Sequence, residues 1–159
     1  MLKEILILTI ITFLPFLELR ASIPYGIFKT NLNWFVVFIV CVLANIALAL
    51  CVYVFVNYVM HFFLRIKSID KIYKKVIERT QKKIHPYVEK YGVIGLALFI
   101  GVPLPGSGVY TGGLGAYLLG FEFKDYMIAS IIGVIIAGII VLLISLFGNG
   151  AWMFLIKTM

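Results

Sequence analysis

Two charged residues stand close together in an otherwise apolar N-terminal stretch. Glu18 and Arg20 follow 13 uncharged residues, and the next eight positions carry no further charge. Inside a membrane such groups are costly, and they face a cavity or one another. A carboxyl group can exchange a proton, and a guanidinium has a planar fork that suits phosphate. We therefore interpret the pair as a candidate transport site, with a structural ion pair that stabilises a buried loop as the open alternative.

A second stretch of unusual backbone lies at residues 101–108, which read Gly-Val-Pro-Leu-Pro-Gly-Ser-Gly. Two prolines remove backbone donors and three glycines lower helical preference, so we expect no continuous helix there. Ser107 and Ser22 read as helix N-caps, and Pro24 would lie in the first turn after Ser22. Two capped half-helices would direct partial positive charge toward Arg20, which predicts an anion site.

The elements that position these residues belong to a membrane protein. The 159-residue chain is 63% hydrophobic and 13% charged, with a mean hydropathy of +1.10. Average soluble chains are roughly half apolar and about a quarter charged. Each membrane span needs about 20 apolar residues, so one domain of this length has room for only a few spans. A large soluble catalytic domain is excluded.

Two clean spans and two interrupted segments make up the apolar part. Residues 34–64 and 126–147 are uncharged and long enough to predict transmembrane helices. Two other uncharged runs, of 13 and 12 residues, are too short to cross, and they end at the motifs 18–26 and 101–108. We expect both motifs to be non-helical breaks at the tips of re-entrant hairpins. Such backbone is tolerated only inside protein or facing water, so the breaks should meet in a shared polar cavity.

The basic residues predict the orientation. Residues 65–90 hold nine of the 14 Lys and Arg residues, and short basic loops stay in the cytoplasm. Apolar residues at helical spacing among these lysines predict an amphipathic helix on anionic headgroups, and no nucleic acid is needed to explain the charge. The second half of the chain then repeats the first half with the opposite orientation in the membrane, as in many secondary transporters. Aligning Ser22 with Ser107 also aligns Tyr25 with Tyr110.

The sequence thus predicts an all-α, multi-pass integral protein of the plasma membrane with two inverted repeats, each a re-entrant helical hairpin followed by a transmembrane helix. The segments of this single domain 1–159 are hairpin 5–33, span 34–64, basic cytoplasmic segment 65–90, hairpin 91–121 and span 126–147. The candidate substrate-binding residues are Glu18, Arg20, Ser22, Pro24, Tyr25, Pro103, Pro105, Gly106, Ser107, Gly108 and Tyr110. Three further glycines, Gly112, Gly113 and Gly115, are expected to allow close helix packing.

The two motifs resemble a known family. Residues 18–26, ELRASIPYG, and residues 103–113, PLPGSGVYTGG, are similar to the small multidrug export proteins of bacteria and archaea, over nearly the whole chain. That family is distantly similar to the DedA, or VTT-domain, superfamily. This superfamily has two opposed re-entrant hairpins, and its better understood members move lipids such as polyprenyl phosphates between leaflets. The chain departs from the DedA pattern, because it has no carboxylate directly after residues 103–107 and no arginine-rich second motif.

The resemblance implies drug efflux by the family name and lipid translocation by the superfamily. We expect a transporter or lipid translocase that moves an amphipathic, phosphate-bearing lipid by alternating access. An exporter of lipophilic cations is the first alternative. An intramembrane serine hydrolase built on Ser107 is the second, but neither clean span carries an interior histidine to act as its base. No enzyme is therefore expected.

The expected partners are membrane lipids, a coupling proton or sodium ion, and a second copy of the chain. A homodimer is expected because two spans and four hairpin arms are few to enclose a polar cavity. We expect the N-terminal segment to be retained rather than cleaved as a signal peptide, because Glu18 and Arg20 stand where small residues should prepare cleavage. No metal or cofactor is expected, since metal-ligand spacing is missing around Cys41, Cys51, His61 and His85.

Overall fold

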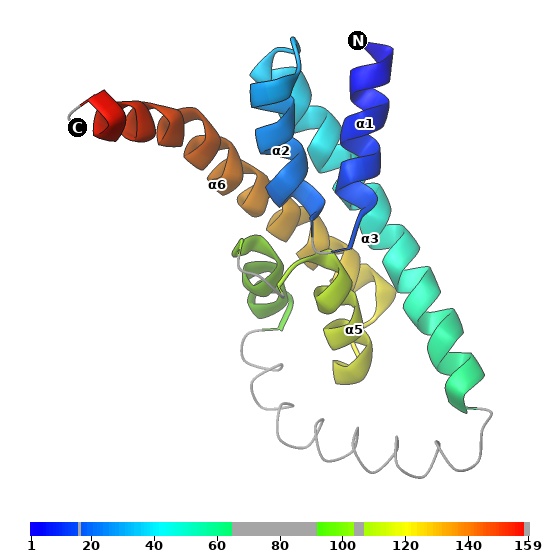
Figure 1. Ribbon diagram of the computed structural model, residues 1–159. Helices are drawn as coiled ribbons and strands as arrows, with labels where there is room; N and C mark the ends of the chain where they lie inside the picture. Colours follow the sequence, from blue (N-terminus) through cyan, green and yellow to red (C-terminus); the bar gives the residue numbers. More distant parts are fainter. Residues whose placement is uncertain (16, 65–91, 104–106, 158–159) are drawn as a thin grey trace.

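The computed structural model describes residues 1–15, 17–64, 92–103 and 107–157, and the regular elements in these ranges are all helices. They are α1 (Leu2–Phe13), α2 (Glu18–Lys29), α3 (Trp34–Leu64), the helix Gly92–Gly101, α5 (Val109–Leu119) and α6 (Phe123–Lys157) (Figure 1). The all-helical fold is confirmed for this part of the chain. The predicted basic segment 65–90 lies outside the described residues.

A proline ends α1 and begins the first turn. Leu14 has φ −72° and ψ 130°, the extended conformation expected of a residue before proline, and Pro15 follows it. The chain then reverses, and α2 runs back beside α1 (Figure 1). The turn therefore lies between the end of α1 at Phe13 and the start of α2 at Glu18. The predicted break at 18–26 is wrong, because these residues form most of α2 with Pro24 inside the helix.

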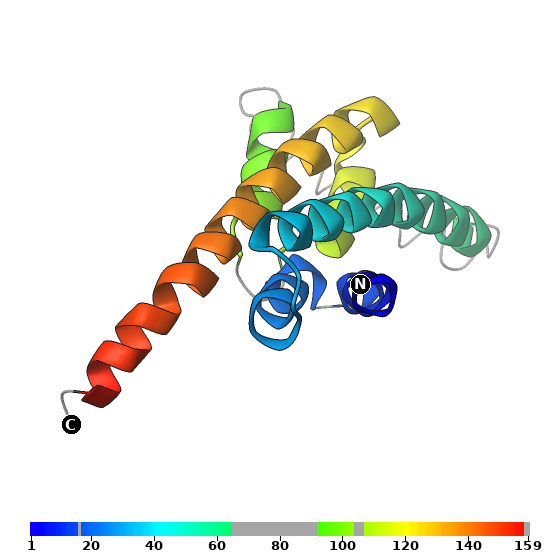
Figure 2. The same cartoon turned by 90° about the horizontal axis from the view of Figure 1, so that it is seen from above.

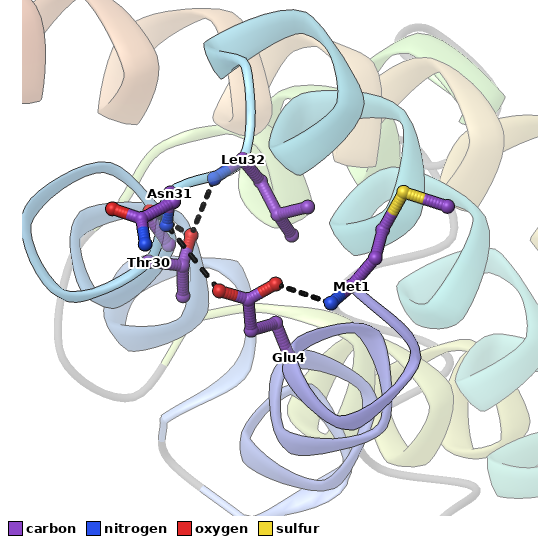
Figure 3. Close-up of polar contacts among 6 residues, drawn as sticks. Met1, Glu4, Thr30, Asn31 and Leu32 are labelled. Atoms are coloured by element: carbon purple, nitrogen blue, oxygen red, sulfur yellow. Dashed lines mark hydrogen bonds and ion pairs between the residues drawn. The ribbon is translucent and has the colours of Figure 1, made fainter.

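The open end of this first hairpin is closed by polar contacts. Glu4, in the first turn of α1, lies 2.8 Å from the Met1 amino nitrogen through one carboxylate oxygen and accepts a hydrogen bond from Asn31 N through the other, at 3.4 Å (Figure 3). Thr30 Oγ1 accepts a hydrogen bond from Leu32 N at 3.3 Å beside them. Both outer ends of the α1–α2 hairpin therefore lie at the same end of the molecule.

The two long helices agree with the two predicted spans. α3 has 31 residues, and Asn33 Oδ1 accepts a hydrogen bond from Phe35 N at 2.9 Å at its start. α6 has 35 residues and begins at Phe123 rather than at residue 126. Within them, Trp34–Val59 and Phe123–Gly148 are each apolar over 26 residues, enough to cross a membrane. Their large apolar side chains remain exposed at Leu43, Leu50, Val54, Phe55, Ile132, Ile135, Ile139 and Leu143, as lipid contact requires.

The long helices form the centre of the packing. α3 and α6 cross each other, and α2 and α5 each contact both of them, while α1 packs on α2 and α3 (Figure 2). The largest fully buried side chains come from five helices and the start of α5: Tyr126, Leu8, Ile23, Ile100, Val37 and Val109. In Figure 1 the lower end of the α1–α2 hairpin lies beside the start of α5, and α2 and α5 extend from there in opposite directions.

Close helix packing is confirmed for two of the three glycines expected to allow it. A Cβ at Gly112 would lie 2.6 Å from Ile100 Cγ1, and one at Gly113 would lie 2.7 Å from Val52 Cγ1. The expectation is wrong for Gly115, where a Cβ would meet nothing within 4 Å. The sequence analysis missed Gly133, whose Cβ would lie 2.7 Å from the carbonyl oxygen of Ala97.

Candidate functional site

The two hairpin tips meet through side chains of α2. The first turn of α2 carries Glu18 and Arg20, and it lies against the end of the loop that leads into α5 (Figure 1). Four hydrogen bonds described below join the α2 side chains to that loop and to the start of α5. We use "tip site" for this region, defined by Glu18, Arg20, Ser107, Gly108 and Tyr110.

Glu18 connects the start of α2 to the start of α5. Its side chain is only 7% exposed, and its two carboxylate oxygens accept hydrogen bonds from Val109 N at 3.3 Å and Tyr110 N at 3.5 Å. These backbone groups belong to the first turn of α5, where helical N–H groups have no partner within the helix. The carboxylate thus caps α5 and faces the positive end of its dipole. Its own backbone has φ +44°, a left-handed conformation that is uncommon outside glycine.

Gly108 is required by this contact for two reasons. Its φ is +123°, a conformation that side-chain-bearing residues rarely adopt. A Cβ there would also lie 2.5 Å from Glu18 Oε2. The loop backbone therefore approaches the carboxylate as closely as it does only because this residue has no side chain.

Arg20 makes the second connection between the hairpins. Its Nη2 donates to both the carbonyl oxygen and the hydroxyl oxygen of Ser107, each at 2.8 Å. The Ser107 hydroxyl donates in turn to the carbonyl of Val102 at 2.5 Å, across the loop. The partly buried guanidinium thus holds the loop that follows the helix Gly92–Gly101. Glu18 and Arg20 contact separate parts of the second hairpin. Glu18 contacts the start of α5, and Arg20 contacts the loop before it.

Two tyrosines complete the set of contacts. Tyr110 Oη donates to the carbonyl of Phe13 at 2.6 Å, which joins α5 to the end of α1. The fully buried Tyr126 donates through Oη to the carbonyl of Val109 at 3.1 Å, which joins the first turn of α6 to α5. Tyr126 was absent from the predicted site, and nothing in its spacing distinguishes it from other aromatic residues at a membrane boundary.

The two N-cap predictions are wrong. Ser22 lies inside α2, where its hydroxyl donates to the carbonyl of Glu18 at 3.1 Å and lies 2.8 Å from Thr12 Oγ1. Ser107 contacts Arg20 and Val102 instead of the first N–H groups of α5, and Gly108 is the N-cap residue without a side-chain cap. Because Glu18 takes the place of the cap, the start of α5 already faces a carboxylate. The part of the predicted anion site that remains is the Arg20 guanidinium.

The other predicted site residues fall into two groups. Pro24 and Tyr25 lie in the second half of α2, away from its first turn, and Tyr25 is exposed. Pro24 has no N–H to donate to the carbonyl of Arg20, so it interrupts the helical ladder one turn after the site. Pro103 follows the helix Gly92–Gly101 and contributes to its end. Pro105 and Gly106 lie outside the described residues.

Two buried polar residues of α1 and α3 were not among the predicted site residues. Thr12 is fully buried, and its hydroxyl lies near Ser22 across the α1–α2 hairpin. Asn45, on α3, is fully buried beside the Glu18 carboxyl group. A polar amide in an otherwise apolar span is the signal that could have placed Asn45 in the site.

The chain was compared with known proteins. No curated protein matches it, and no solved structure matches it. A family profile, described as "Putative small multi-drug export protein", matches residues 18–140. The match begins at Glu18 and includes the whole second hairpin loop, so it contains every residue of the tip site. Since it covers more than half of the sequence, the chain belongs to this family of small multidrug export proteins.

Proposed function

We propose that this protein is a membrane transporter whose two hairpins are re-entrant, enter the bilayer from opposite faces, and bind an amphipathic substrate where their tips meet. The observation that carries the proposal is the pair of contacts from one turn of α2: Glu18 to the start of α5, and Arg20 to Ser107. Both charged groups lie on α2, which packs against the two long apolar helices. Polar groups so placed in membrane proteins mark substrate pathways.

Alternating access would proceed through the tip contacts. Each half, a hairpin followed by a long helix, would act as one inverted repeat, as in many secondary transporters. The side-chain hydrogen bonds that join the tips are few, and each has a modest net free energy of about 1–3 kcal/mol. Rocking of one half against the other could therefore exchange them for contacts with a substrate headgroup.

A phosphate-bearing lipid is the substrate class that we propose. Arg20 is only partly buried, whereas Glu18 is 7% exposed, so the guanidinium is the more accessible charge at the tips. A guanidinium suits phosphate because its planar N–H groups match two phosphate oxygens. The acyl or prenyl chains would lie against the exposed apolar faces of α3 and α6.

Export of lipophilic cations is the second candidate, favoured by the description of the family and by the buried Glu18 carboxylate. A serine hydrolase is not supported by the contacts of Ser107. Its hydroxyl donates to the Val102 carbonyl and accepts from the Arg20 guanidinium, so its proton is held by a backbone carbonyl, which is not a catalytic base. A transporter rather than an enzyme therefore remains the proposal.

Reconstituted proteoliposomes test the two substrate classes. We expect the protein to move a fluorescent polyprenyl phosphate between leaflets, with a loss of about tenfold or more in Arg20→Ala. Lys29→Ala is the matched control, because Lys29 is an exposed cation at the other end of α2. Transport of a lipophilic phosphonium ion without lipid movement would replace the lipid with the cation as substrate. Full lipid movement in Arg20→Ala would contradict the site.

The proposal includes a homodimer in the plasma membrane with residues 65–90 in the cytoplasm. A second copy would add helices to the enclosure of the tip site, to which one copy contributes two long apolar helices. Light scattering of the protein in detergent, corrected for the micelle, measures the protein mass. A mass of about twice 17.9 kDa is expected, and a monomer across the tested concentrations would contradict this part of the proposal.

A further inference from the structure

Asn45 is a buried amide without a hydrogen-bond partner. It lies in the middle of α3, its side chain is 0% exposed, and neither Nδ2 nor Oδ1 has a partner among the described residues. Buried polar atoms are nearly always paired, because an unpaired donor or acceptor loses its hydration without compensation. The carboxamide lies beside the Glu18 carboxyl group. It therefore presents a donor and an acceptor to the one carboxylate of the tip site.

The surroundings of Glu18 come from every element packed against it. On its own helix, Arg20 provides a positive charge, and the first turn of α5 provides two backbone N–H groups together with the Tyr110 phenol. α3 provides Asn45, and α6 provides the Tyr126 phenol, which donates to the Val109 carbonyl. The backbone groups and Arg20 only donate, and the two phenols already donate to backbone carbonyls. The Asn45 amide oxygen has no described donor, so we assign it as the acceptor of a proton on the carboxyl group.

We infer that Asn45 is the hydrogen-bond partner of Glu18 in both of its charge states, so that this pair between α2 and α3 carries the coupling proton of the proposed transporter. This inference rests on the proposed function. In the charged state, the Asn45 amide N–H donates to the carboxylate. When a proton adds to one carboxyl oxygen, rotation of the amide places Oδ1 to accept the new O–H. No other bond forms or breaks.

A proton fits this pair better than a sodium ion does. Hard cations take several oxygen ligands, and the described groups that face the Glu18 oxygens from α5 are N–H donors, which repel a cation. Arg20 adds a positive charge nearby. One proton needs only one carboxyl oxygen and one acceptor, and Glu18 with Asn45 provides both.

Infrared titration of the purified protein in lipid nanodiscs tests the inference without substrate. The carboxylic-acid C=O band of Glu18 is assigned by its absence in Glu18→Gln. In Asn45→Leu both states of the carboxyl group lose this partner. The charged form loses more, because a hydrogen bond to an ionised group is stronger than a neutral one, so we expect the protonation midpoint of this band to rise by about one pH unit. Asn57→Leu is the matched control, because Asn57 is an exposed amide on the same helix. Its midpoint should equal that of the unsubstituted protein.

An unchanged midpoint in Asn45→Leu would overturn the inference, and so would an equal shift in Asn57→Leu. A midpoint that depends on sodium at constant ionic strength would replace the proton with sodium. Asn45→Leu should fold, because it replaces unpaired buried polar atoms with an apolar side chain of similar size. The titration does not depend on a transport assay. If the protein moved no substrate, the proposed function would be contradicted, and the titration would still test the pairing of Glu18 with Asn45.

Discussion

The carboxylate of Glu18 accepts a hydrogen bond from the backbone N–H of Val109, a residue 91 positions later in the chain. Helix N-caps are usually provided by a residue adjacent to the helix. Here α5 is capped from another hairpin, and its own N-cap residue has no side chain. The first turn of α5 and the first turn of α2 therefore depend on each other, which links the conformations of the two hairpins.

Gly108→Ala is predicted to separate the tips. The substitution places a Cβ 2.5 Å from Glu18 Oε2 at a φ of +123°. The backbone conformation alone costs about 1–3 kcal/mol, and the lost hydrogen bonds to a charged group cost about 1.5–3 kcal/mol more. We expect a clear decrease in the thermal unfolding temperature of the purified protein and a loss of transport of tenfold or more.

Gly115→Ala is the matched control for this substitution. Gly115 lies in the same helix, α5, and a Cβ there would meet nothing within 4 Å. The change should leave transport intact and leave stability unchanged or slightly higher, because alanine favours helix more than glycine does. Equal effects of the two substitutions would contradict the role of Gly108 at the Glu18 carboxylate.

The long helices could be predicted from the sequence because lipid imposes a strong pattern. An uncharged run from residue 34 to residue 64 predicts a helix with the bounds that α3 has. The break in the first hairpin could not be placed, because the prediction followed the charges and Pro24. The effective signal was Pro15, which forces Leu14 out of the helical conformation. Pro24 is accommodated inside α2, since losing one helical hydrogen bond does not end a helix that packs on three others.

The candidate site was predicted in part. Glu18, Arg20 and Ser107 do come together, because the cost of burying charge and irregular backbone in an apolar chain points to these residues. Their roles were not predictable from local rules. The N-cap rule selects a serine beside the helix, whereas the cap of α5 is Glu18, a contact between residues far apart in sequence. No local pattern encodes such a contact.

Tyr110→Phe is predicted to weaken the contact between α5 and α1. Its hydroxyl donates to the Phe13 carbonyl at 2.6 Å, and its removal leaves that carbonyl without this donor. The expected loss of stability is about 1 kcal/mol, measured by thermal or denaturant unfolding in detergent. Tyr117→Phe is the control on the same helix, since the Tyr117 hydroxyl has no hydrogen-bond partner within the described part of the chain. A similar loss in both variants would contradict the prediction.

Two serine substitutions are predicted to have opposite effects. Ser107→Ala removes the hydroxyl that accepts from Arg20 Nη2 and donates to the Val102 carbonyl, while the backbone carbonyl that also accepts from Nη2 stays. Stability should therefore fall by about 1–2 kcal/mol and transport should decrease. Ser130→Ala removes a buried hydroxyl that has no hydrogen-bond partner among the residues described, so stability should be unchanged or higher. The measurement is unfolding of both proteins under one condition. A larger loss of stability in Ser130→Ala than in Ser107→Ala would show that the tip contacts do not stabilise this region.

Cysteine labelling is predicted to place the two hairpins on opposite faces of the membrane. The background is Cys41→Ala with Cys51→Ala, which removes both free thiols that the structure describes. In this background, Asn31→Cys reports the open end of the first hairpin, and Lys124→Cys reports the position where α6 begins after the second; both residues are exposed. A membrane-impermeant maleimide should label the first from outside intact cells and the second only after the cells are opened.

A third position separates a re-entrant hairpin from a pair of membrane-crossing helices. Lys3 is exposed near the start of α1, and the contact of Glu4 with Asn31 places both ends of the hairpin together (Figure 3). Lys3→Cys should therefore label from the same side as Asn31→Cys. α1 and α2 have 12 residues each, about 18 Å of helix, which is too short to cross about 30 Å of hydrocarbon. If Asn31→Cys and Lys124→Cys label from the same side, the inverted arrangement is wrong. Both hairpins would then enter the bilayer from one face, and the contacts between α2 and α5 would form between two hairpins of the same orientation.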